Sequence, residues 1–437
     1  MKKTLLLSVV ASTMIMAGGD IAPVEPAVET PAPAVSGWEF SGQAALYYQT
    51  HDAFGDSDLF DQDSSAANAG LQLRAVNSDL YNGIGAGVEV SGLATFDLEN
   101  SVVSDVMQGF RTDDLDGGWI SQMYLTYGFD NTSFKLGRQE LPKALSPFAF
   151  SEEWNVFKNT YDALLVVNTD ISDTTLVGAW VRSANQNGYG LGAMNGFNPS
   201  FNFQAGMPPL LGAFASDMNS FEEINGDHGV FMLTAQNKSI ENLTLTGSWY
   251  YSSEFLTNDD LNILWGDAQY NFMQNYTLGL QGGTVMHDTF ADDTTAFGAM
   301  IGGKYDIFHG ALAFSTVNDG GFGVFNVGGQ QTALYTQMML NERAIGFDND
   351  TFMVKVGADV LGGKVCAAYG MSDMGMGDYN EFDLSYSAKV TDSIDLTVAY
   401  AFMDADVTMV DDTEEEPVLV PFDESNNVIR VIGRYNF

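Results

Sequence analysis

The last eleven residues of the chain, Asn427 to Phe437, alternate in character with a period of two. The odd positions form an apolar face: Ile429, Val431, Gly433, Tyr435 and Phe437. The even positions carry the polar residues beside two apolar ones: Val428, Arg430, Ile432, Arg434 and Asn436. This pattern is typical of a strand with lipid on one face and water on the other, although a soluble sandwich would alternate in the same way.

The same alternation recurs along the chain in eighteen runs. We expect strands at residues 38–50, 69–78, 84–96, 118–128, 133–139, 161–169, 174–183, 229–237, 243–252, 262–271, 276–286, 294–305, 311–318, 351–360, 364–371, 379–390, 394–404 and 427–437. Short connectors rich in Asp, Asn, Gly and Ser alternate with long ones: 51–68, 97–117, 140–160, 184–228, 319–350 and 405–426 among them. A transmembrane barrel has short turns at one end and long loops at the other, whereas a soluble sandwich has no reason to alternate them.

A membrane location restricts the fold further. No stretch of about 20 apolar residues follows the N-terminal segment, so a membrane protein with this sequence must be a closed barrel. The chain also contains 46 Gly, 11 Pro and 12% aromatic residues, which suits many strands and few helices. The sequence therefore predicts an all-β transmembrane antiparallel barrel of about 18 strands.

The N-terminus reads as an export signal. Lys2 and Lys3 precede a short apolar run and the small residues Ala17, Gly18 and Gly19. We expect a signal peptide at 1–19, cleaved after Ala17 or Gly19, a Pro-rich linker at 20–37 and the barrel at 38–437. Removal of the signal takes the net charge from −40 to −42, which argues against a nucleic-acid partner. With Cys366 as its single cysteine, the exported chain is expected to hold together without disulfides.

The segments Ile120–Gly128 and Phe134–Leu141, the long loop that follows them and the ending Arg434–Phe437 resemble the epsilonproteobacterial major outer-membrane porins. They resemble the OprD-type porins more loosely. The resemblance covers nearly the whole expected mature chain and implies an outer-membrane location, eighteen strands and a homotrimer. It also implies that the terminal Phe is read by the barrel-assembly machinery.

In the resembled family the third long loop folds into the barrel and narrows it. In this chain that loop is 140–160, and its candidate constriction residues are Glu140, Lys143, Phe148, Phe150, Glu152, Glu153, Trp154 and Lys158. Four large aromatics in an exposed loop, with Phe157 the fourth, would favour aggregation, which is a reason to expect burial in the lumen. They could instead pack the loop onto its own rim. For the longest loop, 184–228, folding inward and lying over a neighbouring subunit both stay open.

Alternation assigns thirteen charges to the lumen: Arg74, Glu89, Arg182, Asp267, Lys304, Lys355, Asp359, Lys364, Glu381, Asp383, Lys389, Arg430 and Arg434. A Lys or Arg facing mid-membrane hydrocarbon costs roughly 2–4 kcal/mol, so these charges are better placed in water. Arg138 departs from the pattern because it shares parity with Phe134 and Leu136. Either a bulge at Gly137 turns Arg138 inward or it lies above the lipid.

Four acidic residues, Asp56, Asp58, Asp61 and Asp63, are a tentative Ca²⁺ site, although their spacing matches no EF-hand. No other cofactor is expected. A catalytic barrel would need a His beside Ser, Asp or Asn, and among four His only His287 is suggestively placed, so no enzyme is expected.

We therefore expect an outer-membrane porin that passes small hydrophilic solutes and ions by passive diffusion through a water-filled barrel, with modest cation preference from its net charge. The alternatives are a substrate-specific channel of OprD type, which would use a ladder of arginines that this chain mostly lacks, and a surface adhesin.

Overall fold

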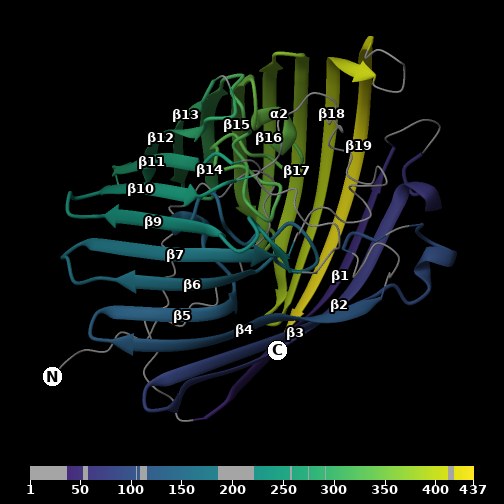
Figure 1. Ribbon diagram of the computed structural model, residues 1–437. Helices are drawn as coiled ribbons and strands as arrows, with labels where there is room; N and C mark the ends of the chain where they lie inside the picture. Colours follow the sequence, from purple (N-terminus) through teal and green to yellow (C-terminus); the bar gives the residue numbers. More distant parts are fainter. Residues whose placement is uncertain are drawn as a thin grey trace.

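The computed structural model describes residues 37–52, 58–104, 106–108, 116–185, 221–255, 258–273, 275–290, 292–411 and 418–437. Its strands form one antiparallel sheet. β8 is a two-residue strand that pairs with the end of β7, so the wall itself is a closed barrel of eighteen strands. Figure 1 shows this wall curling around a space that coil segments enter. The prediction of an all-β barrel of about eighteen strands is confirmed.

The first half of the wall consists of β1 (Glu39–His51), β2 (Ser65–Tyr81), β3 (Ile84–Ala94), β4 (Gly117–Phe129), β5 (Thr132–Gln139), β6 (Tyr161–Asn168), β7 (Thr174–Ala184) with β8 (Glu222–Glu223), β9 (Val230–Asn237) and β10 (Leu243–Ser252). The second half consists of β11 (Leu261–Phe272), β12 (Tyr276–His287), β13 (Thr294–Tyr305), β14 (Phe308–Val317), β15 (Asn349–Val360), β16 (Gly363–Met374), β17 (Gly377–Thr391), β18 (Ile394–Asp411) and β19 (Val418–Asn436).

Among the described residues, helical structure is confined to single turns in the connections: η1 (Gln62–Ser64), η2 (Leu98–Asn100), η3 (Lys143–Leu145) and α2 (Glu342–Ile345). Within the described part of the chain, no helix has the length and apolar character needed to cross a membrane.

Closure is made by the first and last strands. β1 pairs with β2 on one side and with β19 on the other, in a register that runs from Gln43 opposite Asn436 to His51 opposite Val428. Since the two ends of the sheet pair with each other, their backbone donors and acceptors are satisfied within the wall.

The two faces of β1 and β19 separate as alternation requires. Leu46 on the outer face is 65% exposed, whereas its neighbours Ala45 and Tyr47 on the inner face are each 2% exposed. On β19, Arg430 and Ile432 are buried on the inner face, while Tyr435 is exposed on the outer face. The outer face is therefore apolar over most of its height.

Tight turns join the strands at one end of the barrel. Several of their residues adopt positive φ: Asn82, Gly83, Asp130, Asp173, Asn242, Asp306 and Gly362. Hairpin turns of this kind suit right-twisted strands and favour Gly, Asn and Asp, which explains why composition located these turns.

The prediction that residues 405–426 form a loop is wrong over much of that length. β18 continues to Asp411 and β19 begins at Val418, paired throughout, so most of this segment is a hairpin extension. Its outer positions carry polar residues such as Asp406, Asp423 and Ser425, which hid the strand from a search for apolar alternation. Outer positions that lie beyond a membrane are free to be polar, and strand pairing continues without the apolar face.

A row of five aspartates crosses the outer face of neighbouring strands: Asp350, Asp373, Asp378, Asp406 and Asp423. Asp350 lies opposite Asp373, which lies opposite Asp378, and the register continues to the last two. All five are exposed and share parity with apolar residues below them, such as Phe352 and Met371. The row therefore marks the border where the apolar outer face of β15 to β19 ends.

Like charges directly opposite on a sheet destabilise it, by roughly 0.2–1 kcal/mol for a pair. We therefore expect Asp373→Asn, which removes a charge that faces Asp350 and Asp378, to raise the stability of the detergent-solubilised barrel by about that amount in urea unfolding at low salt. The gain should shrink as salt screens the row. The control is Asp404→Asn, because Asp404 lies opposite the neutral Asn380 and Ser425. Equal effects from the two substitutions would contradict this account of the row.

Candidate functional site

Loop 140–160 lies inside the barrel and reaches opposite walls. Phe148 packs edge-on against Trp265 of β11, and its backbone N–H donates to the Tyr250 hydroxyl of β10 at 3.2 Å. Further along the loop, the Tyr47 hydroxyl of β1 donates to the carbonyl of Trp154 at 2.8 Å. These contacts carry the loop across the lumen between β10–β11 and β1.

The aromatic residues of this loop are its anchors. Phe148, Phe150 and Phe157 are fully or almost fully buried, and Trp154 is half-buried. Phe148 belongs to an apolar cluster with inner-face residues of β6, β7 and β9 to β13, while Phe157 packs with Tyr47 and Ile432 on the other side. An apolar inner wall of this kind would be unfavourable in a fully water-filled barrel, and the loop covers it.

A second loop, 318–348, also enters the barrel, and sequence reasoning missed it. Met338 packs against inner-face residues of four strands, β13 to β16: Met300, Ala313, Met353 and Ala368. Residues 320–341 contain no charged side chain. An uncharged run of that length in an otherwise acidic chain was the available signal, since a loop bathed in water would more often carry charge.

Glu152 joins the two loops. Its carboxylate accepts hydrogen bonds from the backbone N–H groups of Gln330 and Gln331 at 2.9 and 2.8 Å, and from Asn326 Nδ2 and Trp154 Nε1 at 2.8 Å each. Burial raises the pKa of Glu152, and these hydrogen bonds oppose the shift. Lys143 of the same loop donates to the carbonyl of Thr332 at 2.8 Å, and burial lowers its pKa to about 8.

Side chains on the inner face of the barrel wall bind loop 318–348. Asp383 and Glu381 of β17 accept hydrogen bonds from the backbone N–H groups of Met339 and Leu340 at 3.1 and 2.9 Å. On the far wall, the Tyr335 hydroxyl donates to Asp267 of β11. Three of the predicted lumen carboxylates thus fasten a loop rather than stand free in the lumen.

Charged residues gather along one edge of loop 140–160. Lys158 contacts Glu140 at 3.2 Å and also contacts Glu153. These three side chains, the loop-edge charges, are 36%, 38% and 30% exposed inside the barrel, so water reaches them. Burial alone would lower the pKa of Lys158, but the two carboxylates outweigh it and raise that pKa above its ordinary value. Burial alone would raise the pKa of Glu140, but the nearby Lys158 and Arg74 outweigh it and lower that pKa.

The wall facing this edge is also charged. Arg74 of β2 donates to the Tyr124 hydroxyl at 3.1 Å, and Glu89 of β3 accepts from the Ser121 hydroxyl at 2.8 Å. Lys135 of β5 lies over the Tyr124 ring, 4.1 Å from its centroid. Sequence reasoning omitted Lys135, although its parity with Ser133 and Gly137 would have found it.

The other predicted lumen charges also occupy the inner face. Lys304 lies 2.5 Å from Asp359, and Lys355 is fully buried. Arg430 donates to Gln49 Oε1 at 2.8 and 2.9 Å, and Arg434 donates to loop 140–160.

Arg182 is the exception. A register shift beside Ala163 leaves Arg182 unpaired in the β6–β7 ladder, and it shares parity with the outer-face residue Trp180. Its guanidinium, 44% exposed, contacts Glu223 at 2.7 Å and Asp227 at 3.2 Å. The prediction that Arg182 lines the lumen is therefore wrong, because carboxylates near the end of the wall hold it on the outer side.

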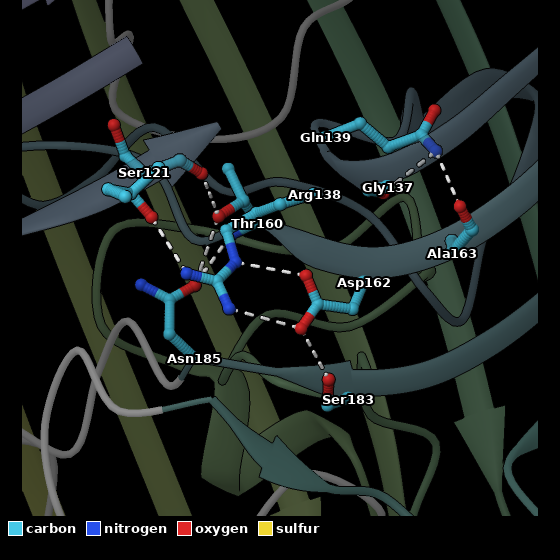
Figure 2. Close-up of polar contacts among 10 residues, drawn as sticks. Ser121, Gly137, Arg138, Gln139, Thr160, Asp162, Ala163, Ser183 and Asn185 are labelled. Carbon is cyan, nitrogen blue, oxygen red and sulfur yellow. Dashed lines mark hydrogen bonds and ion pairs between the residues drawn. The ribbon is translucent and has the colours of Figure 1, made fainter. Parts of the chain in front are cut away.

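Arg138 also stays on the outer face. The pairing of Gly137 with Tyr124 is continuous, so no bulge inverts Arg138, which lies opposite the exposed Met123. Figure 2 shows its guanidinium facing Asp162 in a two-pronged contact at 2.9 and 3.1 Å, with Ser183 donating to the same carboxylate at 2.8 Å. The matched carboxylate neutralises the charge on the outer surface.

The tentative calcium site stays a prediction. Asp56 lies outside the described residues, and the carboxylate of Asp61 accepts a hydrogen bond from the backbone of Asp58 at 3.3 Å. Among the described residues, no three acidic, His or Cys side chains are grouped so that they could hold a metal ion. His287 is buried between Phe290 and Phe322, and its Nε2 lies 2.8 Å from the carbonyl of Phe255. Most of loop 184–228, residues 186–220, lies outside the described part.

Comparison with known proteins identifies structural neighbours alone. No family model matches the sequence, and no curated protein does. The fold is similar to that of OccK8 (OprE) from Pseudomonas aeruginosa, with TM-score 0.65 and 14% identity over 93% of this chain and 99% of that one. It is also similar to the outer membrane protein OpdK of the same organism (0.67, 12%, 93% and 100%) and to OccAB2 of Acinetobacter baumannii (0.63, 13%, 92% and 98%).

The buried carboxyl of Glu342 in α2 should make loop packing pH-dependent. Burial raises its pKa to about 7, with a further upward contribution from Glu381. The folded state therefore binds a proton more tightly than the unfolded chain, whose carboxyl titrates near 4.5. Stability from this group is complete below pH 4.5 and is lost as the pH rises to 7.

We expect Glu342→Gln, which mimics the protonated carboxyl, to flatten the fall in stability between pH 4.5 and 7, measured by urea unfolding at a series of pH values. At pH 8 the variant should be more stable than the wild type. Glu424→Gln, at an exposed position on β19, is the control and should leave the profile unchanged. A wild-type profile retained in Glu342→Gln would show that this carboxyl does not titrate as described.

Proposed function

We propose that this protein is an outer-membrane porin through which small hydrophilic solutes and ions diffuse passively. The observation that carries the proposal is the exposure of the loop-edge charges Glu140, Glu153 and Lys158 inside a barrel whose outer face is apolar. Water inside and apolar side chains outside are the arrangement of a membrane channel. The fold shared with the outer membrane protein OpdK supports it.

In this proposal the two inward loops set the width of the passage. Loop 140–160 covers inner-face residues of β6, β7 and β9 to β13, and loop 318–348 covers those of β13 to β17. The passage therefore runs beside the charged edge that faces β2 to β5. Arg74 and Lys135 on the wall face Glu140 on the loop, an arrangement that orients dipolar solutes. No energy input is required.

A channel specific for organic anions is the second candidate, because lysines cluster on the inner face. Lys355, Lys364 and Lys389 lie at inner positions of the neighbouring strands β15, β16 and β17, and Lys304 lies on β13, two strands from β15. OpdK, one of the structural neighbours, has been solved with vanillate, an aromatic carboxylate. Four further expectations stay predictions: a homotrimer, a specific relationship to the epsilonproteobacterial porins, calcium in the acidic loop and an adhesive role for the loops.

Planar-bilayer recording tests the proposal. We expect steady single-channel current, with a reversal potential in a KCl gradient that indicates modest cation preference. Current proportional to salt concentration supports a general pore, whereas block by millimolar benzoate but not by benzylamine supports the anion-specific channel. A folded, inserted barrel that passes no current would contradict both and leave the adhesin.

Glu153→Gln distinguishes lumen charge from total charge. The substitution removes one negative charge beside the passage, so the reversal potential should shift toward anions. Asp404→Gln removes the same charge from the outer face and should leave the reversal potential unchanged, since salt screens distant charges within about 8 Å. Equal shifts in the two variants would place selectivity at the mouths, where net charge acts, rather than beside loop 140–160.

A further inference from the structure

The tip of loop 140–160 meets the barrel at the seam where β1 and β19 close the wall. Three consecutive carbonyl oxygens of the tip, those of Trp154, Asn155 and Val156, accept hydrogen bonds from side chains of these two strands. The Tyr47 hydroxyl of β1 donates to Trp154 at 2.8 Å. The Arg434 guanidinium of β19 donates to Asn155 at 2.9 Å and to Val156 at 2.7 Å.

Tyr47 and Arg434 are well placed to donate to the carbonyl oxygens of the loop tip. Tyr47 is buried, so its hydroxyl has little access to water and the Trp154 carbonyl satisfies it. Arg434 is half-buried and also donates to Gln43 Oε1 of β1 at 2.7 Å, which fixes the guanidinium across the seam. A planar guanidinium with several fixed donors can hold two adjacent carbonyls, whereas a Lys ammonium offers one point charge.

Packing supports the same placement. Val156 and Phe157 lie against Tyr47, Ala45 and Ile432 in one buried cluster. Gly70 of β2 leaves room for them, because a Cβ at this position would meet Phe157 Cζ at 2.6 Å and Val156 Cγ1 at 2.9 Å. The wall is therefore shaped for the tip as well as bonded to it.

From this geometry we infer that Tyr47 and Arg434 are positioning residues that dock the loop tip on the closing seam and so set the width of the channel. The inference rests on the proposed function. The neighbouring Arg430, four residues before Arg434 on the same face of β19, donates to the Gln49 side chain of β1. It also lies over the rings of Tyr47 and Trp154, 5.7 and 5.9 Å from their centroids. The docked tip also requires a closed barrel, since its donors come from both seam strands.

The first test is electrical. Tyr47→Phe removes one donor and keeps the ring, so the undocked tip should become about fivefold more populated, as expected for one neutral hydrogen bond. Arg434→Lys keeps the charge and should raise that population by more than about tenfold. Both variants should show more frequent high-conductance substates at an unchanged reversal potential. Arg182→Lys is the matched control and should behave as the wild type, because Arg182 lies on the outer face, where it contacts Glu223 and Asp227.

The second test needs no current. In a Cys366→Ala background, Val156→Cys places a near-isosteric thiol in the buried tip, and its rate of alkylation by iodoacetamide reports undocking. We expect Tyr47→Phe to speed alkylation about fivefold. Gly70→Ala should speed it too by displacing Phe157, whereas Gly433→Ala, where a Cβ meets nothing within 4 Å, should not.

The outcomes separate the two proposals. Alkylation and substates equal to the wild type in both Tyr47→Phe and Arg434→Lys would overturn the positioning role while the porin stands. A wild type that conducts nothing, but whose alkylation responds as expected, would overturn the porin and leave the docking intact. If Arg434→Lys fails to assemble, Gly70→Ala decides the question of docking, because this substitution leaves every hydrogen-bond donor in place.

Discussion

Pairing of β1 with β19 is the constraint on which the rest of the structure depends. It joins residues almost four hundred positions apart and turns an open sheet into a wall without unpaired ends. In hydrocarbon, an unpaired strand would expose backbone groups at a cost of several kcal/mol each, so closure decides whether the wall is stable in a membrane. Once it is made, each residue has an inside or an outside, and alternation along the strand acquires its meaning.

Closure also creates a difficulty, because eighteen strands enclose more space than inner-face side chains can fill. Loops 140–160 and 318–348 fill part of it with buried aromatic and aliphatic side chains. Their backbones then need partners away from bulk water, and carboxylates supply them. Glu152 serves the backbone of the second loop, and Glu381 and Asp383 serve it from the wall. A buried carboxylate is tolerable at Glu152 because backbone, amide and indole N–H groups donate to it.

The sequence was informative where one physical rule acts along the chain. Alternation and turn composition located the strands, since lipid and water face every strand in the same way. The inward course of loop 318–348 was missed because the loop shows no alternation of apolar and polar residues. Its lack of charged side chains was the available signal. Arg182 was assigned to the lumen because it is charged, although it shares parity with the outer-face residue Trp180, and Glu223 and Asp227 hold it on the outer side. The extended β18–β19 hairpin was missed because the need for an apolar outer face stops where the membrane does.

Position, rather than number, decides what the charges of this acidic chain do. The net charge of −40 suggests a strongly negative passage. The described residues beside the loop edge are more balanced, since Arg74, Lys135, Lys158 and Arg434 face Glu89, Glu140 and Glu153. Meanwhile, the aspartate row on β15 to β19 lies on the outer face, with the wall between it and the lumen. The charges beside the loop edge act on a solute at contact distance. The charge of the aspartate row is screened by salt within about 8 Å. The net charge of the sequence is therefore a poor guide to the balance of charge beside loop 140–160.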